Sequence, residues 1–145
     1  MNVDEFDWQS FLSFAEEIFE RHHKINVIGM NEETECRIGI SRAYYAVFHK
    51  AEDFISAFKS KFHLDSRDSP HERVINAFKN SDNRYYRKIA INLSKMKELR
   101  IRADYVSERY KPRYEDGNVI GELEKILAYA KSTNKMIDRC RQNND

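Results

Sequence analysis

The sequence predicts an all-α fold, a helical bundle of about five helices, and two observations support this. The chain of 145 residues contains only four Gly and two Pro, whereas 34% of its residues are charged, and this composition favours helices joined by short loops. Apolar residues recur at spacings of three and four along most of the chain, and no segment of useful length alternates as a strand does. We expect residues 1–145 to form a single domain with a polar tail from about residue 141.

The first two expected helices make up the first half of the chain. Residues 4–24 form the first, because apolar side chains recur at helical spacing and early acidic residues suit the positive end of the helix dipole. After a connector, Asn31 is expected to cap a long second helix that continues to about Lys61. This helix holds much of the expected core, namely Ile40, Tyr44, Val47, Ala51, Phe54, Ile55 and Phe58.

The third expected helix has the clearest start in the sequence. Ser69 is expected to be its N-cap, because Pro70 suits the first helical position and Glu72 suits the third. The helix is expected to stop near residues 80–83, where four polar residues follow one another. It is therefore short.

Two further helices complete the expected bundle. The fourth follows directly and keeps apolar positions at helical spacing as far as Ala103. Residues 106–118, which contain Pro112 and Gly117, form the longest irregular stretch. The last helix is expected to begin near Val119.

The charges are unevenly distributed, although the net charge is only +1. Residues 1–35 contain nine acids and two bases, whereas residues 84–113 contain ten bases and three acids. The basic segment is interleaved with Tyr85, Tyr86, Tyr105, Tyr110 and Tyr114. This mixture suits RNA backbone contact with base stacking, and it equally suits a protein interface rich in Arg and Tyr or an acidic helix lying beside a basic one.

Several classes of protein are disfavoured by the sequence. No apolar run approaches the length of a membrane span, and no secretory signal follows Met1, so we expect a soluble cytoplasmic protein. Cys36 and Cys140 lie far apart and read as reduced cysteines. We find no Cys/His metal spacing and no phosphate-binding Gly-rich loop, and therefore expect no metal and no cofactor.

Residues 41–51 carry the most informative pattern in the chain. On a helix, a polar face is formed by Arg42, Tyr45, His49 and Asp53. A small and apolar face is formed by Ala43, Val47, Ala51 and Phe54. One face can therefore pack while the other presents a cation, a phenol and an imidazole in a row. The alternative is a buried helix whose polar side pairs internally with carboxylates.

Three segments resemble a known family. Residues 42–51 (RAYYAVFHKA) resemble the second-helix motif of the HEPN superfamily, whose members are small helical bundles. Residues 70–78 look like the short middle helix of these proteins. Residues 99–105 are similar to the Arg-x-x-Ala-Asp-Tyr motif that closes the fourth helix in one prokaryotic subgroup. The motifs follow one another in the order that the family shows.

The resemblance implies a homodimeric bundle linked to RNA metabolism, toxin–antitoxin pairs or defence systems. Active members are metal-independent endoribonucleases that use an Arg followed a few residues later by a His, near the fourth helix. An imidazole can move a proton to or from the ribose 2′-hydroxyl, and a guanidinium can hold the phosphate. A nucleotidyltransferase-type antitoxin is the partner protein that the resemblance implies.

This chain departs from the family pattern at the fourth helix. All five histidines precede residue 72, so no imidazole follows Arg100 or Arg102. We therefore expect His49 to act as the acid/base, with Arg42 and Arg102 on the phosphate. The residues expected to contact RNA or a nucleotide are Tyr45, Arg100, Asp104 and Tyr105.

The same residues can also be interpreted as structural rather than catalytic. Arg42 is then the neutralising partner of Asp104 or Glu98, His49 satisfies a core hydrogen bond, and His71 contributes to local packing. Three functional hypotheses follow: an RNA-associated toxin or defence protein acting as an endoribonuclease, a non-catalytic dimeric module that engages a partner protein, and a nucleotide-binding sensor.

Overall fold

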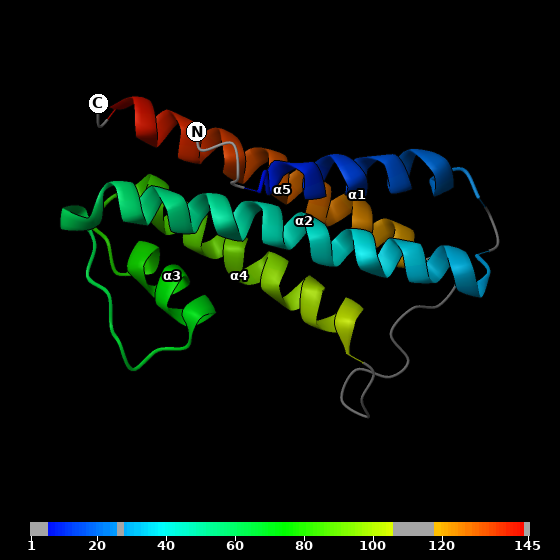
Figure 1. Cartoon of the computed structure of the whole chain (residues 1–145), viewed down its shortest axis with the longest axis horizontal. Coiled ribbons are helices and arrows are strands. Elements are labelled where there is room, and N and C mark those ends of the chain that lie inside the picture. The colour runs from blue at the N-terminus through cyan, green and yellow to red at the C-terminus, as the bar shows by residue number, and fades with distance from the viewer. Residues whose placement is uncertain (1–5, 26–27, 106–117, 144–145) are drawn as a thin grey trace.

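The computed structural model describes residues 6–25, 28–105 and 118–143, and these residues form a bundle of helices (Figure 1). Its elements are α1 (Gln9–His22), α2 (Met30–Ala57), the short 3₁₀ turn η1 (Lys59–Lys61), α3 (Pro70–Lys79), α4 (Arg84–Asp104) and α5 (Asn118–Asn143). Helices α1 and α4 run in one direction along the bundle, and α2 and α5 run in the other. The prediction of an all-α bundle of about five helices is confirmed.

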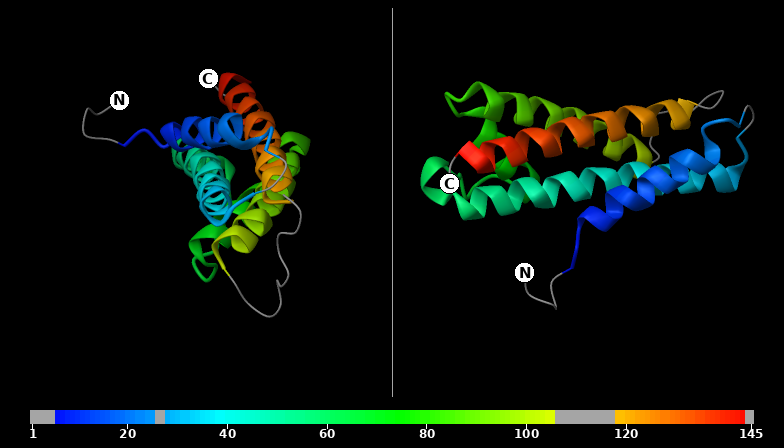
Figure 2. Two further views of the ribbon diagram at one scale, coloured as in Figure 1. Left: turned by 90° about the vertical axis from the view of Figure 1, so that its right-hand side faces the viewer. Right: turned by 90° about the horizontal axis from the view of Figure 1, so that it is seen from above.

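Helix α2 lies at the centre and packs against each of the other helices. Figure 2 shows α1 and α5 on one side of α2, with α3 and α4 on the other. The two predicted faces of α2 are present, because Ala43, Val47 and Ala51 are fully buried, whereas Arg42, Tyr45 and His49 are half-buried. The sequence pattern thus places the polar row of α2 at the edge of the core.

Helices α1, α2 and α5 pack closely at Gly39. A Cβ atom at this position would lie 3.3 Å from Cδ1 of Ile18 in α1 and 3.3 Å from Cδ1 of Leu123 in α5. Gly39 therefore lets three helices approach one another, and any side chain would push on two buried neighbours.

A second, aromatic part of the core lies where α3 covers the end of α2. The ring of Phe54 lies 6.1 Å from that of Phe78 in α3 and 5.9 Å from that of Tyr86 in α4, centroid to centroid. Phe62, in the connection before α3, stacks on Tyr86 at 5.1 Å. These contacts fix α3 against α2 and α4.

Two predicted boundaries of α2 are wrong. The helix begins at Met30 with Gly29 as its N-cap, because the Gly29 carbonyl accepts from the N–H of Glu33 at 3.0 Å. Asn31, the expected cap, already lies inside the first turn. At the other end Phe58 leaves helical geometry with φ −121° and ψ 42°, so α2 ends at Ala57 and only η1 continues to Lys61.

The predicted start of α1 is too early, whereas that of α3 is confirmed. Helix α1 begins at Gln9, and the described residues 6–8 precede it, although the sequence predicted a start at residue 4. Ser69 is the N-cap of α3 as predicted, and its hydroxyl accepts from the N–H of Glu72 at 3.3 Å.

The last two helices are also in place. The side chain of Asn83 accepts from the N–H groups of Tyr85 and Tyr86 and so starts α4. Helix α5 continues to Asn143, past residue 141 where the polar tail was expected. The loop predicted over residues 106–118 lies outside the described residues except for Asn118, which is helical. None of the described helices is long and apolar enough to cross a membrane.

We expect Gly39→Val to lower the free energy of unfolding by about 1–3 kcal/mol, because the added methyl groups overpack the contact with Ile18 and Leu123. The matched control is Gly121→Val, since a Cβ at Gly121 meets nothing within 4 Å. This control should change stability by less than about 0.5 kcal/mol. Urea unfolding followed by circular dichroism measures both, and equal effects at the two sites would contradict the packing described here.

Candidate functional site

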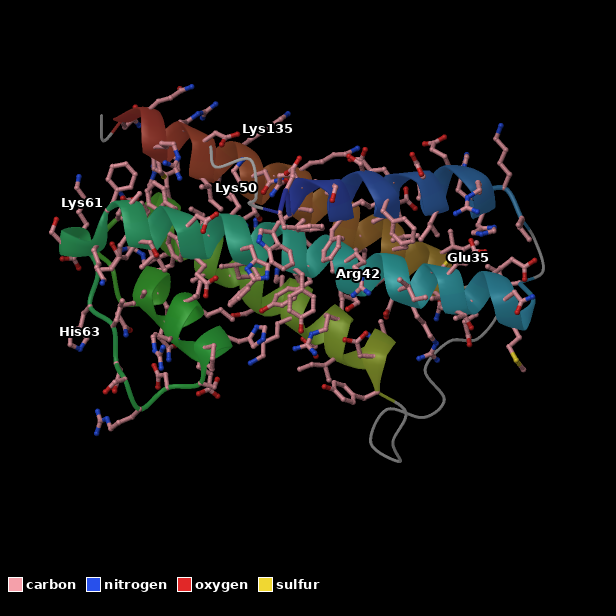
Figure 3. All side chains as sticks on the ribbon, in the orientation of Figure 1. Glu35, Arg42, Lys50, Lys61, His63 and Lys135 are labelled. Carbon is pink, nitrogen blue, oxygen red and sulfur yellow. The ribbon has the colours of Figure 1, made fainter. Side chains whose placement is uncertain are left out.

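Arg42 lies on the middle of α2 (Figure 3), and its guanidinium lies over the ring of Phe11 in α1. The guanidinium carbon lies 5.0 Å from the centroid of the Phe11 ring, which is a cation–π distance. One structural interpretation of the sequence paired Arg42 with Asp104. In the structure the cation that forms an ion pair with Asp104 is Arg100. Arg42 is therefore part of the α1–α2 contact.

Arg102 lies on the side of α4 that faces α5. Its Nη2 forms an ion pair with Oε1 of Glu122 in α5 at 2.5 Å, and Glu122 is only 7% exposed. Because Arg100 and Arg102 are two positions apart on a helix, they lie on nearly opposite faces of α4. The structure thus places Arg102 with a buried carboxylate of α5, apart from the contacts that surround His49.

Arg100 is the buried cation between α2 and α4. It is 7% exposed, and its guanidinium carbon lies 5.6 Å from the ring centroid of Tyr44 and 5.5 Å from that of Tyr45. Its Nη1 donates to Oδ2 of Asp104 at 3.4 Å, and the same carboxylate oxygen accepts from Ser41 at 3.2 Å. Two predicted ligand-binding residues, Arg100 and Asp104, are therefore bonded to each other.

The other two predicted contact residues lie at the surface. Tyr105 follows the last residue of α4 and is 55% exposed. Tyr45 is half-buried, with one edge of its ring against Tyr44 at 5.4 Å. Both phenol rings remain accessible to a ligand.

His71, at the second position of α3, bonds to the centre of α2. Its Nδ1 lies 2.8 Å from the Tyr44 hydroxyl. Burial raises the pKa of Tyr44 far above its ordinary value, more than Arg100 lowers it, so Tyr44 remains a phenol whose hydroxyl can donate this hydrogen bond. With Tyr44 as the donor, the neutral ring of His71 accepts at Nδ1 and carries its proton on Nε2.

The surroundings of His71 favour its neutral form. Burial lowers the pKa of its imidazole, and the positive charges of Arg100 and Lys97 and the ring of His49 lower it further. The carboxylate of Asp104 pairs with Arg100. At neutral pH His71 is therefore a neutral group that offers an N–H.

His49 is held by Trp8, the residue before α1, and by its own helix. Its imidazole stacks on the Trp8 ring at 3.7 Å with an angle of 20° between the planes. Its Nδ1 lies 3.3 Å from Oε1 of Glu52, and because an ionised carboxylate only accepts, Nδ1 donates to it. This bond leaves the lone pair of the neutral ring on Nε2, where a proton can be accepted.

The two imidazoles are neighbours across α2 and α3. The Phe48 ring lies 4.5 Å from that of His71 and 5.4 Å from that of His49. The Tyr45 ring lies 5.9 Å from His71 and 6.2 Å from His49. We call Tyr45, His49, His71, Lys97 and Arg100 the two-histidine cluster.

The two-histidine cluster combines positive charge with two imidazoles that differ in which ring nitrogen carries the proton. One ring accepts a proton, the other offers one, and two cations lie on the adjacent helix α4. Such a group suits an anionic ligand such as a phosphodiester. Within the described residues, no set of three or more His, Cys, Asp and Glu side chains is arranged to hold a metal ion.

Comparison with known proteins adds no assignment. No family model matches this chain, and neither a curated protein nor a solved structure does. The HEPN resemblance therefore stays a prediction from residues 41–105.

Sequence reasoning missed the role of His71. Its hydrogen-bond partner Tyr44 is 27 positions away in the chain. A signal for it was present, because His71 lies three and four positions before Val74 and Ile75, which are buried, and so shares their face of α3. That face turns His71 toward the core, and a polar residue there needs a partner.

We expect Arg102→Met to lower the free energy of unfolding by about 1–3 kcal/mol, because it removes the Arg102 ion pair from the buried carboxylate of Glu122. A double variant, Arg102→Met with Glu122→Gln, should recover part of this loss. Thermal unfolding measures both. A single variant as stable as the wild type would contradict the structural role of Arg102.

Titration of His71 should be visible in the pH dependence of stability. Because its pKa is lowered in the folded protein, its contribution is fully present above the ordinary value of 6.5 and is lost as the pH falls below it, where the unfolded chain takes the proton first. We therefore expect wild type to lose more stability than His71→Gln between about pH 7 and pH 5. Urea unfolding across this range measures the difference.

The control for this measurement is His63→Gln, because His63 is exposed on the loop before α3 (Figure 3). Its stability should follow the wild-type pH curve. Parallel curves for wild type and His71→Gln would contradict the environment assigned to His71.

Proposed function

We propose that this chain is a HEPN-like RNA-binding protein that cleaves RNA without a metal ion at the two-histidine cluster. The observation that supports this most is the pairing of a proton-accepting imidazole, His49, with a proton-offering imidazole, His71, beside Lys97 and Arg100. The sequence had predicted a different catalytic site, in which His49 acts with Arg42 and Arg102.

The proposed reaction is an internal transfer on the RNA backbone. Nε2 of His49 takes the proton of a ribose 2′-hydroxyl, and the 2′-oxygen forms a bond to phosphorus while the bond to the 5′-oxygen breaks. The leaving 5′-oxygen takes a proton from water, and His49 returns its own proton to water. The products are a 2′,3′-cyclic phosphate and a 5′-hydroxyl end.

The remaining members of the cluster stabilise charge and hold the substrate. The Nε2–H of His71 and the ammonium of Lys97 are suited to non-bridging phosphate oxygens, where negative charge grows in the transition state. Arg100 is buried, so it contributes its charge and positions the tyrosines. The exposed ring of Tyr105 and the half-buried ring of Tyr45 are suited to stacking on bases.

The test is cleavage of a mixed RNA pool in EDTA. We expect His49→Ala to reduce the rate by about 10²–10⁴-fold, because it removes the general base. His63→Ala, which removes an exposed imidazole far from the cluster, should retain the wild-type rate. Mass analysis of the fragments identifies the cyclic phosphate ends. Unchanged cleavage by a folded His49→Ala protein would refute the assignment.

A second candidate function is a non-catalytic module that engages a partner protein, which the resemblance identifies as a nucleotidyltransferase-type antitoxin. The observation in its favour is that three arginines are all engaged within the chain, with Phe11, Asp104 and Glu122 as the partners of Arg42, Arg100 and Arg102. A well-folded wild type that binds such a partner and leaves every RNA intact would favour this function.

We also propose a homodimer in the cytoplasm for either function. Cys36 and Cys140 are both buried, and neither forms a disulfide within the described residues, as expected for reduced cysteines of a cytosolic protein. Burial raises the pKa of the Cys36 thiol to about 11, with help from neighbouring glutamates, so this thiol is unreactive at neutral pH.

A further inference from the structure

A hollow of about 520 Å³ lies between the chain before α1, the second half of α2 and the end of α5. It is lined by residues 6–9, Lys50, Asp53 and Arg141, and we call it the N-terminal hollow. Figure 3 labels Lys50 on α2. The volume is within the ordinary range for a small-molecule site. Asp53 belongs to the polar face predicted for α2, so this face extends into the hollow.

Most polar groups of the N-terminal hollow are engaged within the chain. Nζ of Lys50 forms an ion pair with Asp138 at 2.7 Å. The side-chain amide of Gln9 is hydrogen-bonded at both ends, to α2 and to α5. The guanidinium of Arg141 lies over aromatic rings at the end of α2. These groups therefore hold the walls of the hollow together.

Two groups in the hollow remain open to a ligand. The carboxylate of Asp53 is exposed, and in the part of the chain that the structure describes no hydrogen bond or ion pair engages it. The ring of Phe6 is 53% exposed and stands edge-on to Trp8, with 4.9 Å between the ring centroids. The hollow therefore offers an aromatic surface beside a carboxylate, which only accepts hydrogen bonds when ionised.

This combination of groups selects guanine among the RNA bases. An aromatic ring stacks on any base, whereas a carboxylate discriminates between base edges. The Watson–Crick edge of guanine carries two adjacent donors, N1–H and the N2 amino group, which match the two oxygens of a carboxylate. Adenine and cytosine have an acceptor nitrogen beside their amino group, and uracil has a carbonyl on each side of its N–H. Each of these bases would turn a lone pair toward Asp53.

The N-terminal hollow lies directly beside the proposed acid/base. Trp8 lines the hollow and also stacks on the imidazole of His49, with 3.7 Å between the centroids. Asp53 follows His49 by one turn of α2, a rise of about 6 Å. A nucleotide whose base lies in the hollow can therefore place its phosphate near His49.

We propose that the N-terminal hollow binds the guanine base next to the phosphate that is cleaved, so that the protein cuts single-stranded RNA at guanosine. This inference rests on the proposed function, because it names the substrate on which the two-histidine cluster acts. The RNA must be single-stranded, since the edge of a paired guanine is already bonded to cytosine. Asp53 is then a specificity-determining residue, and Phe6 supplies the stacking surface.

The first test is nucleotide binding, which does not depend on cleavage. Trp8 is the only tryptophan of the chain, so its fluorescence reports on the N-terminal hollow. Guanosine 3′-monophosphate and adenosine 3′-monophosphate are titrated separately against wild type. We expect the guanosine nucleotide to give a saturable change in Trp8 fluorescence and to bind at least about tenfold more tightly than the adenosine nucleotide.

Asp53→Asn should reverse this preference. An amide at this position presents one acceptor and one donor, which match the amino group and N1 of adenine and oppose one of the two guanine donors. Binding of the guanosine nucleotide should fall about tenfold or more, while the adenosine nucleotide binds more tightly. Asp82→Asn is the matched control, because it makes the same change at an exposed position before α4 and should bind both nucleotides as wild type does.

Phe6→Ala separates stacking from edge recognition. It should weaken both nucleotides by a similar factor, about 5–150-fold, and leave the preference for guanine unchanged, because stacking is tolerant of the base. Circular dichroism melting shows that each variant is folded.

The second test locates the cuts in a single-stranded RNA pool incubated in EDTA. Wild type should leave guanosine at one fixed position relative to each cut, and a duplex of the same sequence should stay intact. Asp53→Asn should replace guanosine at that position by adenosine or cytidine, whose edges match an amide. Sequencing of the fragment ends measures the preference.

The outcomes distinguish this inference from the proposed function. Guanine-selective binding with no cleavage of any RNA would support the hollow as a guanine site and overturn the proposed reaction. Cleavage without a preferred base, or with a preference that Asp53→Asn leaves unchanged, would overturn the guanine site and leave the reaction standing. Equal binding of the two nucleotides, or none, would also overturn it. Guanosine nucleotide that single-stranded RNA does not displace would assign the hollow to a free nucleotide and overturn its role in RNA recognition.

Discussion

Burial of α2 between all the other helices is the constraint on which the structure depends. A helix covered on most of its surface can expose few polar groups, and Gly39, Ala43 and Ala51 allow its neighbours to come close. Polar side chains of α2 are then confined to one stripe or must be bonded, as Ser41 and Tyr44 are. Arg42, Tyr45 and His49 occupy that stripe.

The buried charge of Arg100 links this packing to the candidate chemistry. Its guanidinium lies against Tyr44 and Tyr45 and pairs with Asp104, so a cation is held near the core at the junction of α2 and α4. Tyr44 in turn bonds to His71, which places an imidazole beside this cation. Burial, together with the charge of Arg100, lowers the pKa of this imidazole and so favours its neutral form. The hydrogen bonds and ion pair that hold α2 against α4 therefore also position the imidazole of His71.

The uneven charge distribution of the sequence acquires a spatial meaning in the bundle. The acidic helix α1 packs against α2 and α5, while the basic helix α4 packs against α2, α3 and α5. Acidic and basic groups thus meet along the outer face of α5, and a separate group of cations gathers near His71. The bundle therefore has two distinct charged regions, one over α1 and α5 and one near His71.

Periodicity and capping, which are local properties, determined the helices by themselves: their number, their order, the two faces of α2 and the start of α3 at Ser69 were all predictable. The exact boundaries, such as the start of α2 after Gly29, were not predictable, because several neighbouring carbonyl groups can accept the first hydrogen bond of a helix. Only the tertiary structure decided which charged groups meet. The pairs Arg102–Glu122 and His71–Tyr44 join residues far apart in the chain, and their distances depend on how helices cross, which helical spacing does not encode.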